Sequence, residues 1–168
     1  MVGVRSGNQV VVVGAADANL AAQIAVVTGL NGRTLVIDRG EARVRVEAAA
    51  RRAGALVDFE EAPPTSLPVA AESTDVLVLA LGLASLSADE RARTVEEAMR
   101  VLRPGGRAIV VEGGKASRAA TPAGVSAVTT DAILALLAGV GGKAVRTLAT
   151  VDGLTYYEAR KARAANPA

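Results

Sequence analysis

Small residues and carboxylates follow apolar segments in the first part of the chain, and their types favour the binding of a polar ligand. Gly14 follows the apolar run at residues 10–13. Asp38 follows residues 34–37, and Glu61 comes after a third segment of this kind. A carboxylate accepts hydrogen bonds from two donors at once. In an open parallel sheet, ligands bind beyond the carboxyl ends of the strands, where these residues would meet.

The residue types that are missing exclude several kinds of chemistry. The 168 residues include no histidine and no cysteine. Disulfides, thiolate metal sites, histidine-based triads and His-ligated zinc are therefore excluded. Acid–base chemistry would have to come from carboxylates, lysine or tyrosine. No residue is singled out as catalytic, and no metal site is predicted.

The length and composition predict one domain, over residues 1–161, followed by a disordered tail over 162–168. The chain is 51% hydrophobic but only 2% aromatic, so Val, Leu, Ile and Ala must build the core. The formal net charge of +2 comes from interspersed acids and bases, which does not favour nucleic-acid binding. We find no signal peptide and no apolar run of membrane-spanning length, so a cytoplasmic protein without membrane contact is expected.

Apolar runs alternate with helical patterns in the first third of the chain. Three strands are expected there, at residues 10–13, 34–37 and 55–60. A helix is expected at residues 41–53. Another helix lies between the first two strands. Short connections between these elements predict parallel pairing with right-handed crossovers.

The helix after the first strand has an apolar stripe and a stop signal. Leu20, Ile24 and Val27 fall on one face, which we expect to be buried. Asn31-Gly32 is expected to close the helix.

Residues 87–112 predict a helix, a sharp stop and a buried strand. Ser87 and Glu90 fit a capping box at the start of the helix. The stripe expected to be buried consists of Val95, Met99 and Leu102, whereas the side chains expected to face water are Glu96, Glu97, Arg100 and Arg103. Pro104-Gly105-Gly106 cannot continue a helix, and the apolar run 108–111 predicts a strand covered on both faces.

The end of the chain predicts a helix and an antiparallel hairpin. Thr130 or Asp131 is expected to cap the helix. Residues 144–151 and 154–161 flank Asp152-Gly153, a strong hairpin signal. Alternation along the last strand predicts that Tyr156 and Tyr157 point to opposite sides, one inward and one outward.

Two stretches resemble signatures of the class I S-adenosylmethionine-dependent methyltransferases. VEEAMRVLRPGGRAIVVE, residues 95–112, resembles the family's "evlRvLkPGGrlvlvE". SLPVAAESTDVLVLA, residues 66–80, resembles "sLPfpdgsFDvvvs", with Thr74 in place of an aromatic residue. The resemblance spans residues 10–161 and is greatest to the small-molecule branch with ubiquinone and menaquinone methyltransferases. The alternative is that Pro-Gly-Gly simply ends a helix, as in many α/β proteins.

The resemblance implies a fold for the whole chain. This fold is a Rossmann-like, doubly wound α/β structure with a mostly parallel seven-stranded sheet. Helices cover both faces of the sheet, and the last two strands form the antiparallel hairpin. Simple dinucleotide-binding domains usually continue with a parallel sixth strand instead.

The resemblance also implies how the first loop would bind S-adenosylmethionine. Gly14 matches the first glycine of the family's GxGxG loop, and Ala15 and Ala16 continue it. Ala16 and Ala18 stand where the other glycines would be. An alanine forced into a left-handed conformation would cost roughly 1–2 kcal/mol. A plain strand-to-helix turn is the alternative reading of this loop.

The remaining cofactor-binding residues implied by the resemblance lie after the next strands. Asp38 would hold the ribose hydroxyls, although a solvated turn aspartate is the alternative. Arg39 would pack near the adenine, with a water-facing side chain as the alternative, and the acid Glu61, followed by Ala62, would accept from the adenine amino group. Ala80 and Leu81, at the end of a fourth strand expected over residues 75–80, complete the predicted set.

Methyl transfer needs little acid–base chemistry, which leaves the function open to more than one interpretation. In-line displacement can be driven by proximity and alignment, which supply about 7–11 kcal/mol. The loop at residues 81–85 is apolar and offers only Ser85 as a weak polar candidate. The walls for a small-molecule acceptor would come from residues 113–126 or from a partner subunit in a homo- or hetero-oligomer, because the helices that usually roof the site are missing.

We therefore keep three hypotheses. The first is a methyltransferase acting on a small molecule, an enzyme that uses S-adenosylmethionine. The second is a non-catalytic protein of methyltransferase fold that acts as a partner or scaffold subunit. The third is an NAD(P)-binding domain, which Gly14 and Asp38 support. The sequence G-A-A-D-A-N argues against it, because a dinucleotide site favours G-x-G-x-x-G.

Overall fold

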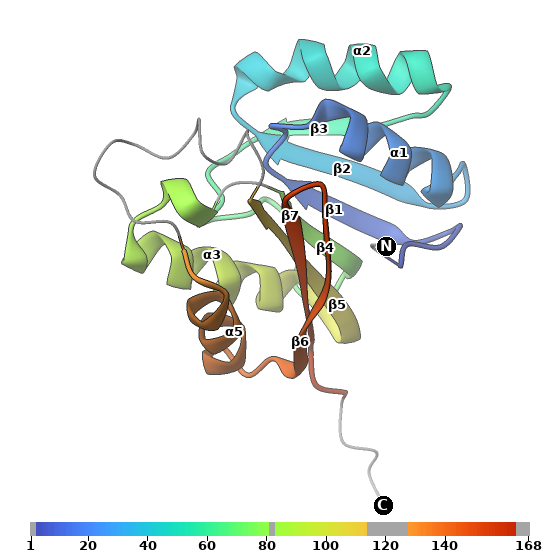
Figure 1. Ribbon diagram of the computed structural model, residues 1–168. Helices are drawn as coiled ribbons and strands as arrows, with labels where there is room; N and C mark the ends of the chain where they lie inside the picture. Colours follow the sequence, from blue (N-terminus) through green and yellow to red (C-terminus); the bar gives the residue numbers. More distant parts are fainter. Residues whose placement is uncertain (1–2, 81–82, 114–127, 164–168) are drawn as a thin grey trace, which may run out of the picture.

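A seven-stranded sheet with helices on both faces makes up the chain (Figure 1). The structure is a computed structural model and describes residues 3–80, 83–113 and 128–163. The strand order is β3-β2-β1-β4-β5-β7-β6; β1 to β5 run parallel, and β7 is antiparallel to both β5 and β6. The predicted fold class is therefore confirmed.

The bounds of the elements are as follows. The strands are β1 (Gln9–Val13), β2 (Arg33–Asp38), β3 (Asp58–Glu61), β4 (Thr74–Ala80), β5 (Leu102–Gly113), β6 (Lys143–Val151) and β7 (Leu154–Arg160). The helices are α1 (Ala18–Thr28), α2 (Arg43–Ala53), α3 (Ala88–Val101) and α5 (Thr130–Gly139), with short 3-10 turns η1 (Gly40–Ala42) and η2 (Leu83–Ser85). None of the helices in these described ranges is long and apolar enough to cross a membrane.

The central strands are apolar on both sides because helices cover both faces of the sheet. Val10 and Val12 of β1 pack in a core with α1 and α2, whereas Val11 and Val13 pack in a second core with α3 and α5. Figure 1 shows α1 and α2 together on one side of the sheet and α3 and α5 on the other. Strands covered in this way need apolar residues at every position, which explains the uninterrupted valine runs.

The junction between α3 and β5 largely follows the prediction. Ser87 and Glu90 form the capping box, and Val95 and Met99 are buried. Leu102 is also buried, but as the first residue of β5 rather than as part of the helix. The residues that follow it, Pro104–Gly106, belong to β5 itself, and Gly105 takes a left-handed φ of 81°.

The predicted apolar stripe of α1 is wrong in part. Val27 is 51% exposed, and the buried face consists of Ala21, Ala22, Ile24, Ala25 and Thr28. The sequence prediction followed the large side chains, whereas small alanines form the face that approaches the sheet. The helix also ends earlier than predicted, at Gly29 with φ 66°, and not at Asn31-Gly32.

Several element ends differ by a few residues. The third strand was expected at 55–60 but occupies Asp58–Glu61, and the cap of α5 is Thr129, whose side chain accepts from the Ala132 N–H. The Asp152-Gly153 hairpin is confirmed, since both residues have positive φ as a tight two-residue turn requires. Tyr156 and Tyr157 do point to opposite faces, but both are buried because both faces are covered.

Glu97 and Arg100 were expected to face water, but both hold the loop that precedes β4. Glu97 Oε2 accepts from the Leu67 N–H at 2.8 Å. Arg100 donates to the carbonyl oxygens of Leu67 and Val69, each at 3.0 Å. The hydrogen bond from Arg100 lowers the pKa of Glu97, and the same bond raises the pKa of Arg100. Glu96 and Arg103 are exposed as predicted.

Glu158 of β7 is a fully buried carboxylate that joins the three last strands of the sheet. Arg107 of β5 donates to its Oε1, and Arg146 of β6 donates to its Oε2 at 2.9 Å. Arg160 lies 3.6 Å from Oε1. Burial alone would raise the pKa of Glu158, but the hydrogen bonds from Arg146 and Arg107 outweigh it, so the pKa lies below its ordinary value.

Replacing this carboxylate should therefore weaken the hairpin and change the acid response. Glu158→Gln should lower the free energy of unfolding by about 1–3 kcal/mol at neutral pH, because it removes the buried charge that three arginines hold and leaves the half-buried Arg107 without its ion-pair partner. A lowered folded pKa contributes stability above the ordinary value of 4.5, and this contribution is lost as the pH falls through the folded pKa. Denaturant titrations between neutral pH and pH 3 should thus show a shallower acid loss in the variant.

The matched control is Asp58→Asn in the exposed ion pair with Arg33, which should change stability by less than about 1 kcal/mol. An acid profile for Glu158→Gln that parallels the wild type would contradict the role of this carboxylate.

Candidate functional site

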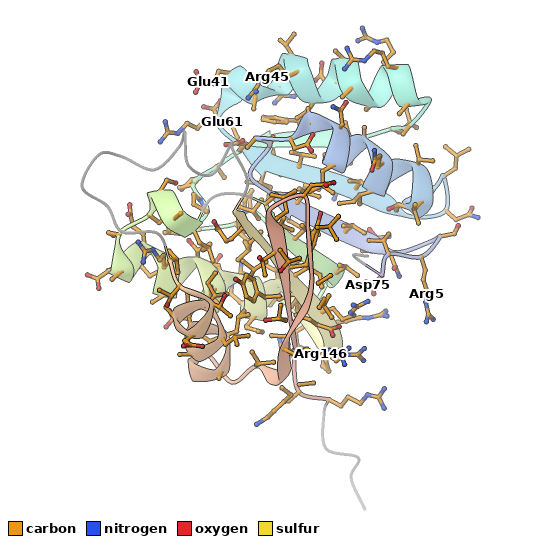
Figure 2. All side chains as sticks on the ribbon, in the orientation of Figure 1. Arg5, Glu41, Arg45, Glu61, Asp75 and Arg146 are labelled. Carbon is orange, nitrogen blue, oxygen red and sulfur yellow. The ribbon has the colours of Figure 1, made fainter. Side chains whose placement is uncertain are left out.

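A cavity of about 890 Å³ lies at the carboxyl ends of the central strands. The strand order reverses at this point, because β2 and β3 lie on one side of β1 and β4 and β5 lie on the other. Ligands of open α/β sheets bind where the strand order reverses. The cavity volume falls within the range of about 300–1,000 Å³ typical of ligand sites. Figure 2 shows Arg45 and Glu61 at this end of the sheet, whereas Arg5 and Asp75 lie at the opposite end.

The structure brings the predicted cofactor-binding residues together around this cavity. The predicted residues that line it are Gly14, Ala15, Ala16, Asp38, Arg39, Glu61, Ala62 and Ala80. Leu81 lies outside the described residues. The cavity extends further than predicted, because Arg45 from α2 and Thr94 from α3 also line it. Neither belongs to a recognisable motif; only their place on helices that follow strand ends could have pointed to them.

Gly14 is the point where the chain turns away from β1 at very close range. Its φ is 88°, and a Cβ at this position would lie 2.5 Å from the carbonyl oxygen of Ala80 on β4. Its N–H donates to the Ile37 carbonyl of β2 at 2.9 Å. A side chain here would thus push the ends of β1 and β4 apart.

The alanines that replace the family's later glycines are not strained. Neither Ala16 nor Ala18 has a positive φ. Ala18 is the first residue of α1, and Asp17 caps that helix by accepting from the N–H groups of Asn19 and Leu20. The left-handed conformation considered for these alanines therefore does not occur, and the loop needs glycine only at position 14.

Asp38 joins the end of β2 to the loop after β1. Its Oδ2 accepts from the Ala15 N–H at 2.7 Å, and its Oδ1 accepts from the Arg39 N–H at 2.7 Å. The side chain is half-buried and lines the cavity. A carboxylate has about four acceptor positions, so Asp38 can also accept from hydroxyl groups of a ligand. Asp38 is therefore not a purely solvated turn aspartate, because its carboxylate holds two backbone N–H groups.

The acidic residue after β3 lies beside η1. The Glu61 carboxylate is so close to Gly40 that a Cβ there would meet Oε2 at 2.5 Å. Figure 2 shows Glu41, Arg45 and Glu61 near one another at the rim of this region. Arg39 and Glu61 are exposed and Ala62 is half-buried, so this side of the cavity is charged and open to water.

The opposite wall comes from η2 and α3 and is more apolar. Leu79, Leu83 and Leu86 line it together with Ser85 and Glu90. The Glu90 carboxylate accepts from the Ser87 N–H and hydroxyl, each at 2.8 Å, and these bonds lower its pKa. Glu90 is thus the ionised partner of Ser87 in the capping box. In the described residues, no group of three or more acidic side chains is arranged to hold a metal ion.

Thr94 is the unusual polar group of this wall. The residue is 1% exposed, and its Oγ1 has no hydrogen-bond partner within the part of the chain that the structure describes. A buried hydroxyl without a hydrogen-bond partner is costly, so Thr94 is expected to reduce the stability of this wall.

A family model described as "Methyltransferase domain" matches residues 11–110. The match runs from within β1 to within β5 and includes every residue that lines the cavity.

Curated relatives carry the same kind of domain. The chain is 32% identical over 120 residues to the ubiquinone/menaquinone biosynthesis C-methyltransferase UbiE of Azotobacter vinelandii, covering 70% of this chain and 47% of that protein. It is 30% identical over 116 residues to UbiE of Pseudomonas entomophila, covering 67% of this chain and 44% of that protein. The aligned region thus spans about half the length of these relatives.

Solved structures share the fold over nearly the whole chain. A SAM-dependent methyltransferase from Aquifex aeolicus superposes with a TM-score of 0.75 at 19% identity, covering 94% of this chain and 84% of that one. A methyltransferase in complex with the Trm112 activator of Haloferax volcanii superposes with a TM-score of 0.76 at 15% identity, covering 99% and 87%. At these identities the similarity shows the fold alone.

The close approach at Gly14 predicts a large effect of adding one methyl group. Gly14→Ala should lower the free energy of unfolding by more than the roughly 1–2 kcal/mol of left-handed strain, because the Cβ also meets the Ala80 carbonyl. Gly54→Ala is the matched control: its φ is 68°, but a Cβ there has open space. Denaturant unfolding should rank Gly14→Ala clearly below Gly54→Ala. Equal losses would show that the contact with β4 is unimportant.

The unpartnered hydroxyl of Thr94 predicts that its removal should stabilise the protein. Thr94→Val should raise the free energy of unfolding by about 1 kcal/mol, because it removes a buried polar group that makes no hydrogen bond. Thr28→Val should do the opposite, since the equally buried Thr28 hydroxyl donates to the Ile24 carbonyl at 2.8 Å. Thermal unfolding of both variants tests the pair. A loss of stability in Thr94→Val would mean that its hydroxyl is satisfied.

Proposed function

The chain belongs to the class I S-adenosylmethionine-dependent methyltransferases, and on this premise we propose that it transfers a methyl group from S-adenosylmethionine to a small-molecule acceptor. The observation that carries the proposal is the cavity between β1 and β4, with the Asp38 carboxylate beside the turn at Gly14. The single domain over residues 1–161 would contain this whole site.

We assign the cofactor to the side of the cavity formed by β1, β2 and β3. Gly14, Ala15 and Ala16, which line this side of the cavity, would pass along its methionine portion. Asp38 would accept from both ribose hydroxyls while it holds the Ala15 N–H. The residues beside the adenine would be Arg39, Glu61 and Ala62, and those nearest the methyl group would be Ala80 and Leu81.

When bound, S-adenosylmethionine supplies an electrophilic methyl group on a sulfonium. The chain's own contribution would be alignment of the acceptor and exclusion of water, which supply about 7–11 kcal/mol in well-oriented reactions. The apolar wall of Leu79, Leu83 and Leu86 suits this role. A strong base is not required for acceptors that are already nucleophilic.

The acceptor would occupy the side of the cavity formed by η2 and α3. The two curated relatives are named for ubiquinone and menaquinone biosynthesis, which supports a small organic acceptor for this chain as well. Further walls from a partner subunit stay a prediction, as do a cytoplasmic location and the lack of nucleic-acid binding. Residues 114–126, the other predicted source of a wall, lie outside the described residues.

The non-catalytic hypothesis is the second candidate. One structurally similar protein was solved in complex with a methyltransferase activator, which supports a partner subunit for a chain of this fold, whether or not the chain itself is catalytic. The NAD(P)-binding hypothesis has less support, because the antiparallel hairpin β6–β7 and the family match both point to a methyltransferase.

Ligand-induced stabilisation separates these candidates. S-adenosylhomocysteine at about 100 times its dissociation constant should add about 2.7 kcal/mol to the free energy of unfolding, whereas NAD should add none. Asp38→Ala should abolish the response, and Asp38→Asn should weaken it while an amide oxygen still accepts from Ala15. Asp58→Ala, on the neighbouring strand and away from this cavity, is the control that should respond like the wild type.

No response to S-adenosylhomocysteine in a folded wild-type protein would favour the non-catalytic candidate. A response to NAD instead would overturn the proposal.

A further inference from the structure

Two charged side chains hold the backbone of Leu83 from opposite directions. Glu112, at the end of β5, accepts from the Leu83 N–H at 2.8 Å through Oε1. Arg91 of α3 donates its Nε–H to the carbonyl oxygens of Leu83 and Leu86, each at 2.9 Å. The segment Leu83–Leu86 is therefore fixed at the Leu83 N–H by a strand that is distant in sequence, and at its carbonyl groups by the helix that follows it.

Burial makes the Glu112 contact a demanding one. The residue is 6% exposed, and Leu83 is 1% exposed. A buried carboxylate is unfavourable unless it is hydrogen-bonded, and its bond to an N–H group is stronger than that of a neutral acceptor. The arrangement thus fixes Leu83 more firmly than an ordinary turn would.

The same arrangement occurs on a second loop beside the same cavity. Glu97 accepts from the Leu67 N–H, and Arg100 donates to the Leu67 carbonyl. This loop begins with Ala62–Thr65, which line the cavity, as do three residues of Leu83–Leu86. An acid and an arginine thus hold one buried leucine on each side, and α3 supplies three of these four side chains.

Neither Glu112 nor Arg91 lines the cavity, so any effect on a ligand must pass through the segment that they hold. Leu83, Ser85 and Leu86 form the wall opposite the Asp38 side. We propose that Glu112 and Arg91 are positioning residues, which keep Leu83–Leu86 in place as the wall against which the methyl acceptor is aligned. This inference rests on the proposed function and adds to it the residues that fix the acceptor side.

Asp75 provides a matched control for a purely structural contact. Its side chain is 10% exposed, and its carboxylate accepts from the Gln9 N–H at 2.7 Å. Figure 2 shows Asp75 at the end of the sheet opposite Glu61, far from the cavity. Loss of either carboxylate removes a bond to a backbone N–H, but only Glu112 acts on a cavity wall.

The experiment compares Glu112→Ala, Glu112→Gln, Arg91→Ala and Asp75→Ala by three measurements. These are hydrogen exchange of the Leu83 amide, affinity for S-adenosylhomocysteine by calorimetry, and methyl transfer from labelled S-adenosylmethionine to an acceptor found by screening small hydroxyl, amine and carbon nucleophiles. Glu112→Ala should speed exchange at Leu83 by about tenfold or more, which is expected for an amide that loses its buried acceptor. Its S-adenosylhomocysteine affinity should stay within about twofold of wild type.

Methyl transfer should separate positioning from stability. Misplacing a bound reactant slightly can cost on the order of 100-fold in rate, so Glu112→Ala and Arg91→Ala should lower kcat by about 10- to 100-fold. Glu112→Gln should restore most of the rate, because its amide oxygen still accepts from Leu83. Asp75→Ala should lose stability but keep kcat. Arg91→Ala tests the same wall if Glu112→Ala does not fold.

The outcomes distinguish two kinds of failure. A wild-type protein that neither binds S-adenosylhomocysteine nor transfers methyl groups would overturn the proposed function, and the inference with it. The positioning role alone would be overturned if the wild type is active but Glu112→Ala and Arg91→Ala match Asp75→Ala in kcat. Unchanged hydrogen exchange at Leu83 in Glu112→Ala would overturn it as well.

Discussion

The close contact between Gly14 and the Ala80 carbonyl is the constraint on which the cavity depends. Because no side chain stands between the ends of β1 and β4, the chain can leave β1 at once and present Ala15 to the neighbouring strand. Asp38 then holds the Ala15 N–H, which joins the ends of β1 and β2 through one carboxylate. Because this connection is short, the cavity beyond the carboxyl ends of the strands stays open.

Helix α3 serves as a common support for the walls of this hollow. Its Arg91, Glu97 and Arg100 reach two loops that come from different parts of the chain. The helix itself is fixed by its capping box and by Val95 and Met99 in the core. The two loops are therefore held by a helix that is itself anchored in the core, and their residues need not pack against one another to stay in place.

The sequence predicted those parts of the fold that depend on neighbouring residues. Continuous apolar runs marked the buried strands, and Asp152-Gly153 marked the hairpin, because backbone twist demands positive φ there. Gly14 and Asp38 were identifiable from their position in the sequence, since each comes directly after an apolar run that predicts a strand. The buried face of α1 was not, because Ala21 and Ala25 carry no strong apolar signal compared with the exposed Val27.

Other parts of the site depend on tertiary contacts. Glu97 and Arg100 have the spacing of a solvent-exposed helical pair, and only the position of the loop at Leu67 gives them backbone partners. Glu112 was visible as the terminal acid of a motif, but its bond to Leu83 joins residues that are 29 positions apart. Arg45 and Thr94 carry no local pattern at all.

Glu112 and Arg91 on one loop, and Glu97 and Arg100 on the other, form hydrogen bonds with main-chain atoms of four residues, which are Leu67, Val69, Leu83 and Leu86. Every amino acid other than proline offers the same N–H and C=O groups. Mutations that alter the loop side chains facing the cavity thus leave this attachment intact.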